Sequence, residues 1–145
     1  MNTKEQVNRL VRIYKTRDPF ELIKGLNVIL VFYPLVDVRG FYQYFQRNNI
    51  IYIDENLPRC EKLFVCAHEL GHMFMHKKAN AIFMDTRTHF NTRKHELEAD
   101  KFAMEYLISD EMITEFCIEK GYTINMLECF WGYNQELIKL RLNNR

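Results

Sequence analysis

Apolar residues recur every three or four positions near the start of the chain and again in its second half, whereas the middle carries short runs of β-branched and aromatic residues. The first of these patterns predicts an amphipathic helix from Thr3 to about Lys15, and Asp18-Pro19 ends it. A short helix or turn over residues 20–25 then leads into the middle region.

Three short runs in the middle of the chain predict β-strands. Residues 27–33 are rich in β-branched and aromatic side chains and are followed by Pro34. Residues 41–46 and 50–53 flank the turn-forming stretch 47–49, which indicates a β-hairpin in a small antiparallel sheet. The aromatic residues expected on the surface of this sheet are Tyr42, Tyr44 and Tyr52.

A long helix is predicted from about Asp54 to His76, because proline is tolerated in its first turn and apolar residues follow around most of its circumference. Residues 77–91 show no clear period and are long for a connection in a compact domain. A second helix is expected from about Thr92, and shorter helices from Ser109 to the end of the chain.

A chain of 145 residues, of which 48% are apolar, is long enough for one α+β domain with its own core. We expect this single domain over residues 1–145, with a core at about 27–108 and a C-terminal helical extension at about 109–145. The net charge of +1 argues against direct binding to nucleic acid. No apolar run approaches the roughly 18 residues of a membrane helix and no signal-peptide pattern is visible, so we expect a cytoplasmic protein without a membrane partner.

The long central helix contains the pattern H-E-x-x-H at His68-Glu69-Leu-Gly-His72. Histidines four residues apart lie on one face of a helix, so their imidazoles can converge on one Zn²⁺ ion. Glu69 lies beside the remaining position of such a metal and is the candidate general base that takes a proton from water. The alternative is that both histidines are core residues that hydrogen-bond their neighbours, but two imidazoles and a carboxylate on an apolar helix need partners.

A catalytic zinc ion has three protein ligands and one open position, so a third ligand must come from elsewhere in the chain. If the next helix packs antiparallel to the first, Glu96 lies at the height of the histidines and is the predicted ligand. Asp100, one turn later, can accept the N–H of a ligand histidine. Glu98 and His95 are the competing third ligands, although Glu98 lies about 200° around the helix from Glu96.

Several other residues could assist the chemistry. His89 and His95 are candidate donors to a transition-state oxyanion, as are the three sheet tyrosines. His76 does not make the longer metzincin motif, because Met75 and Lys78 occupy the positions where that motif has glycine and histidine. Two phenylalanines of the long connection could touch a substrate or pin the connection to the core: Phe83 and Phe90.

The two motifs resemble the ImmA/IrrE family of metallopeptidases. The resemblance rests on His68-Glu-Leu-Gly-His72, on His76, and on Glu96-Leu-Glu-Ala-Asp100-Lys-Phe-Ala103, and it covers about residues 50–108. It implies a zincin-like fold in which a small sheet packs on the H-E-x-x-H helix between helical ends. It also implies an anti-repressor protease of a phage or integrative element, whose protein substrate is a helix-turn-helix transcriptional repressor.

The sequence therefore predicts an endopeptidase that uses one Zn²⁺ ion to activate water. An extended substrate could add to a sheet edge such as residues 50–53, which makes Ile51, Tyr52 and Ile53 candidate substrate-binding residues. The alternative is a zinc-stabilised binding protein that inactivates a repressor without proteolysis.

Overall fold

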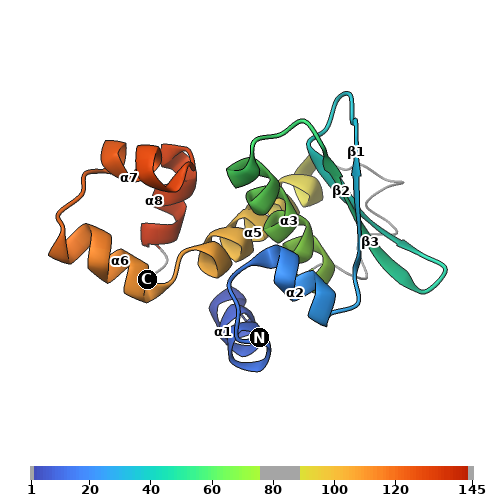
Figure 1. The fold of residues 1–145 in the computed structure, drawn as a ribbon, viewed down its shortest axis with the longest axis horizontal. Helices are drawn as coiled ribbons and strands as arrows, with labels where there is room; N and C mark the ends of the chain where they lie inside the picture. Colours follow the sequence, from blue (N-terminus) through green and yellow to red (C-terminus); the bar gives the residue numbers. More distant parts are fainter. Residues whose placement is uncertain (1, 76–88, 144–145) are drawn as a thin grey trace.

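Two long helices at the centre of the molecule connect a β-sheet on one side with a group of short helices on the other (Figure 1). The computed structural model describes residues 2–75 and 89–143, with the backbone alone for residues 89–92. The predicted α+β class is confirmed. None of the helices in these described ranges combines the length and apolar character that a membrane crossing requires.

Each of the two N-terminal helices begins after a residue that caps it. Helix α1 (Thr3–Tyr14) starts after Asn2, whose side chain accepts the N–H of Glu5 while the Glu5 carboxylate accepts the N–H of Asn2. Helix α2 (Pro19–Gly25) starts after Asp18, which caps it with a hydrogen bond from Phe20. Both helices cover the lower end of the central pair in the view of Figure 1.

The sheet has three strands in the order β1-β3-β2. They are β1 (Ile29–Tyr33), β2 (Gly40–Phe45) and β3 (Asn48–Asp54). The predicted antiparallel hairpin of β2 and β3 is confirmed, but the prediction of a fully antiparallel sheet is wrong, because β1 pairs with β3 in parallel. The chain reverses between β1 and β2 and again in the hairpin, so β1 and β3 point the same way, and β3 inserts between the other two strands.

The hairpin turn lies earlier than residues 47–49. Its two central residues are Gln46 and Arg47, both with positive φ (48° and 65°), which matches the twist of a two-residue hairpin turn. Asparagine is a common residue in such turns, but here Asn48 and Asn49 belong to β3 instead. Pairing of Phe45 with Asn48 fixes this register.

Alternation along the strands points Tyr42, Ile51 and Ile53 into the core, where all three are buried. The expectation that Tyr42 lies on the sheet surface is wrong: its hydroxyl donates to the Asn49 side chain (2.5 Å). The expectation that residues 50–53 form a sheet edge is also wrong, because β3 is the central strand. The peptide groups of Ile51, Tyr52 and Ile53 therefore face two strand partners and leave no edge for a substrate strand.

The central helices are α3 (Arg59–Met75) and α5 (His89–Leu107). Helix α5 begins before the expected Thr92. His76 and Phe83 lie outside the described residues, as do the side chains of His89 and Phe90. The two helices run antiparallel and pack along their length, since His72 meets Glu96 while His68 meets Asp100.

Four short helical segments follow α5 and form the far end of the molecule (Figure 1). They are α6 (Asp110–Ile113), the π-helix η1 (Thr114–Glu119), α7 (Ile124–Trp131) and α8 (Gln135–Asn143). The predicted cap at Ser109 is present, and its hydroxyl accepts the N–H of Met112. Helix α8 is tied to the end of α5 by the buried Arg141, which donates to the carbonyl of Ile108.

Candidate metal centre

Helix α3 presents two imidazoles on one face. His68 and His72 are one turn apart, and their ring centroids are separated by 4.8 Å. Both histidines belong to a helix whose other faces are buried, so their backbone is held on a rigid element. Together with Glu69 they form a cluster whose possible ligand atoms all lie within 4.8 Å of one another.

Helix α5 brings a carboxylate to these imidazoles. The Oε2 of Glu96 lies 3.1 Å from the Nε2 of His68, and its Oε1 lies 2.8 Å from the Nε2 of His72. Ligand atoms at the corners of a tetrahedral zinc site are separated by about 3.3 Å. The three side chains thus already stand near the spacing that one cation would require.

The tautomer of His68 provides a chemical test of this fit. Its Nδ1 lies 2.8 Å from the Oδ1 of Asp100, and a carboxylate can only accept, so Nδ1 carries the hydrogen. In the neutral imidazole, Nε2 then has a lone pair that faces the Glu96 oxygen. Two acceptors at 3.1 Å are stable only with a positive charge between or on them. The donor set therefore fits a bound cation.

The pKa values of His68 and Glu96 reflect the same arrangement. Burial alone would lower the pKa of His68, but hydrogen bonds to Asp100 and Glu96 outweigh it and raise the pKa to about 10. Burial alone would raise the pKa of Glu96, but the hydrogen bonds with His68 and His72 hold it well below its usual range. The site thus favours a carboxylate next to a positive charge.

Glu69 lies beside the two histidines. Its side chain is buried, and one carboxylate oxygen lies 4.0 Å from the Nε2 of His68. Burial raises the pKa of Glu69, although the charges of the two histidines and of Arg39 act in the opposite direction. A carboxylate with a raised pKa is a stronger base, as a general base requires.

The structure brings together five of the predicted residues: His68, Glu69, His72, Glu96 and Asp100. The carboxylate between the two imidazoles belongs to Glu96, and neither of its competitors, Glu98 and His95, takes that place. Ile51 and Ile53 are buried in the core and are not part of this cluster.

Two residues near the site were missed by the sequence analysis. A Cβ added to Gly71 would lie 3.1 Å from the Cα and carbonyl oxygen of Ala99, so this glycine permits the close approach of α3 and α5. A glycine inside a helical pattern is a signal that could have identified it. Arg39 reaches the neighbourhood of the site only through the fold, and no local pattern marks it.

Residues 24–143 match the model of the IrrE N-terminal-like domain family, Peptidase_M78. The chain belongs to this family. One relative is the "Metallopeptidase ImmA" of Bacillus subtilis (strain 168), which is 29% identical over 114 residues. That match covers 77% of this chain and 66% of the ImmA sequence.

A second relative comes from a phage. The "Uncharacterized immunity region protein 2" of Bacillus phage phi105 is 38% identical over 139 residues, which covers 95% of this chain and 87% of the phage protein. Membership of a metallopeptidase family agrees with the His-Glu-His cluster on α3. The chain is therefore a peptidase of the M78 type with a site suited to a metal ion.

Proposed function

We propose that this M78 peptidase is a zinc-dependent endopeptidase that cleaves a helix-turn-helix transcriptional repressor. The observation that carries the proposal is the convergence of His68, His72 and Glu96, with the buried Glu69 beside them. Two imidazoles and one carboxylate are the ligand set of many catalytic zinc sites, and they leave one position open. The Glu96 side chain is 46% exposed, so the cluster is accessible from its α5 side.

In this proposal, separate residues would bind the metal, transfer the proton and orient a ligand. When bound by His68, His72 and Glu96, a zinc ion supplies a Lewis acid that polarises a peptide carbonyl and acidifies water. Glu69 would accept a proton from the attacking water and then deliver it to the leaving amine nitrogen. Asp100 would hold the Nδ1–H of His68, which fixes the imidazole in the tautomer that offers Nε2.

The substrate proposal draws on the relatives. The phage relative is named for an immunity region, and ImmA is named a metallopeptidase. A peptidase in an immunity region would have a transcriptional repressor as a natural target. Removal of the repressor by cleavage would release the genes that it silences.

The decisive experiment compares the wild type with Glu69→Gln, which keeps the ligands but removes the proton carrier. Both proteins are incubated with zinc and with a helix-turn-helix repressor encoded beside this protein's gene. We expect both to bind one zinc ion, and only the wild type to produce repressor fragments and release DNA. Glu119→Gln, at an exposed position on η1, is the control and should cleave.

The alternative of a zinc-stabilised binding protein gives a different result in the same assay. Release of DNA by Glu69→Gln without fragments would support inactivation by binding and overturn the peptidase proposal. Absence of stoichiometric metal in the wild type would overturn the zinc centre itself.

A further inference from the structure

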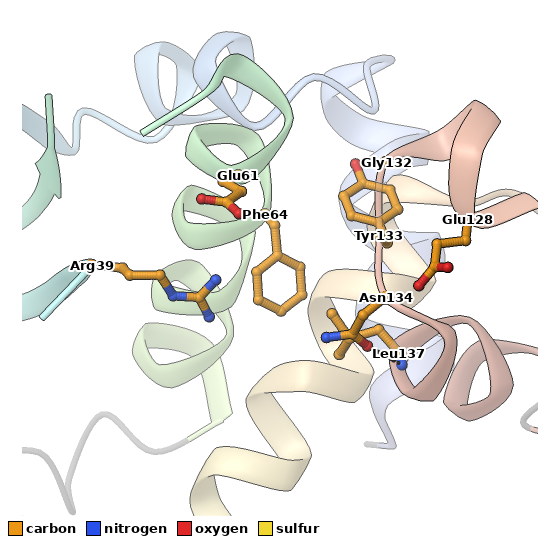
Figure 2. Close-up of a pocket in the computed structure, with 8 residues that line it drawn as sticks. All are labelled: Arg39, Glu61, Phe64, Glu128, Gly132, Tyr133, Asn134 and Leu137. Carbon is orange, nitrogen blue, oxygen red and sulfur yellow. Dashed lines mark hydrogen bonds between the residues drawn. The ribbon is translucent and has the colours of Figure 1, made fainter. Parts of the chain in front are cut away.

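A groove opens between α3 and the turn that joins α7 to α8 (Figure 2). It consists of two adjoining hollows of about 270 and 340 Å³ that share four lining residues: Arg39, Phe64, Asn134 and Leu137. Asp100 lines the second hollow, and the Phe64 ring lies 5.7 Å from the ring of His68. The groove therefore adjoins the candidate metal centre at Asp100.

Arg39 directly precedes β2, and its side chain extends into this groove. Its guanidinium lies 5.8 Å from the centre of the Phe64 ring, and Figure 2 shows it directed across the groove toward the C-terminal helices. The side chain is exposed. Within residues 2–75 and 93–143, no carboxylate or carbonyl accepts a hydrogen bond from it. Arg39 thus offers a fork of donors to something outside the described chain.

The backbone of Arg39 is firmly held. Its carbonyl accepts the N–H of Asp54 at 2.8 Å. The next residue is Gly40, where an added Cβ would lie 2.5 Å from the side chain of Val65 on α3. Because strand and helix meet so closely here, the root of the Arg39 side chain is fixed against α3, and the Phe64 ring orients its tip.

We propose that Arg39 is a substrate-binding residue, whose guanidinium donates hydrogen bonds to a main-chain carbonyl of the peptide that occupies this groove. The proposal rests on the peptidase function proposed above. An acidic substrate side chain is a poorer occupant, because the hollows also contain the carboxylates of Glu61, Glu128 and Glu136. A carbonyl oxygen accepts from the fork and brings no charge that these carboxylates would repel.

Kinetics on a peptide reporter provide the first test. A randomised ten-residue peptide library is incubated with the zinc-loaded wild type, and one peptide whose cleavage requires Glu69 is chosen by mass spectrometry. We expect Arg39→Gln to raise KM about 10- to 100-fold with little change in kcat, as for loss of a charge-assisted hydrogen bond. Arg39→Lys should recover part of the loss, because it keeps the charge but not the fork.

Arg59→Gln is the matched control. Arg59 is also exposed and also lies over a phenylalanine, 5.9 Å from the centre of the Phe20 ring, but it does not line the groove. We expect KM to change less than twofold in Arg59→Gln. Equal KM values for the two glutamine variants would overturn the proposal, and so would a fall in kcat at unchanged KM, which would move the contact to the reacting carbonyl.

A second readout does not depend on cleavage. Phenylglyoxal modifies accessible arginines, so mass spectrometry can follow Arg39 and Arg59 in the Glu69→Gln protein with and without the peptide library. Protection of Arg39 but not of Arg59 supports the groove contact. If Arg39 is protected but no peptide is ever cleaved, the groove contact stands and only the peptidase function fails. Equal modification of Arg39 with and without peptides, at concentrations where the wild type cleaves them, overturns the groove contact alone.

Discussion

Gly71 on α3 lies against the backbone of Ala99 on α5, at the level of the candidate ligands. A Cβ at Gly71 would stand 3.1 Å from the Cα and the carbonyl oxygen of Ala99, and 3.1 Å from the Cβ of Phe102. These neighbours are backbone or the first atom of a side chain, so they cannot swing away. The reach of Glu96 and Asp100 to the histidines therefore depends on the absence of a side chain at Gly71.

Replacement of this glycine should weaken metal binding more than it weakens the fold. Gly71→Ala gains up to about 1 kcal/mol of helix propensity but forces α5 outward at a cost of about 1–3 kcal/mol. We expect a small net loss of stability and about a tenfold loss of zinc affinity, measured by competition with a chromogenic chelator. Gly25→Ala is the control, since its added Cβ would meet the Tyr14 ring at 2.8 Å in a helix that carries none of the ligands. Unchanged zinc affinity in Gly71→Ala would contradict the packing argument.

Replacing Glu96 and Asp100 one at a time by the corresponding amide can separate their roles. Glu96→Gln removes a charged ligand and should abolish tight zinc binding, whereas Asp100→Asn should lower the affinity by about 10- to 100-fold because it only orients His68. Glu98→Gln, on another face of the same helix, is the control. Isothermal titration at constant pH would measure all three. Loss of binding in Glu98→Gln with retention in Glu96→Gln would reassign the third ligand.

The sequence contained enough information for the helices and the ligand cluster, because their signals are local. The H-E-x-x-H spacing puts two imidazoles on one helical face. Glu96 and Asp100 share a face one turn apart, and antiparallel packing of neighbouring helices then brings each to its partner. The caps at Asn2, Asp18 and Ser109 depend on residues close in the chain, and the cap at Ser109 was expected from the sequence.

The sheet was harder to predict, since the position of a strand depends on contacts far along the chain. Nothing within residues 50–53 indicates that β3 lies between the other two strands, so their assignment to a sheet edge failed. Tyr42 carries a hydroxyl, as many residues on a sheet surface do, but its side chain is buried in the core. Arg39 approaches the site only because β2 packs on α3, which a local pattern does not encode.

The metal-free protein should lose stability as the pH rises above neutral. The folded pKa of His68, about 10, is raised from an ordinary value of 6.5. Its charge therefore stabilises the fold fully below pH 6.5, and this contribution disappears as the pH rises through about 10. We expect the urea midpoint of the chelator-treated wild type to fall across this window, and that of His68→Gln to change much less.

The behaviour at acid pH and with zinc checks the same assignment. The folded pKa of Glu96 is lowered, so its contribution is present above the ordinary value of 4.5 and is lost as the pH falls below it. Zinc-saturated protein should lack the alkaline loss, because His68 then binds the cation and not a proton. A chelator-treated wild type whose urea midpoint stays constant from pH 6.5 to 10 would contradict the charged state of His68.

Arg141 should contribute to stability through the charge that it neutralises. It is 2% exposed, and its Nη1 lies 3.5 Å from the Oε1 of Glu105, which is 3% exposed. Arg141→Met removes the cation but leaves this carboxylate buried, so we expect a loss of about 3–5 kcal/mol in the free energy of unfolding. The double variant Glu105→Gln/Arg141→Met should recover part of the loss, because no buried charge remains, and urea denaturation would measure both. A double variant less stable than Arg141→Met would show instead that Arg141 acts mainly through its hydrogen bonds to Ile108 and Asp110, which hold α8 against the end of α5.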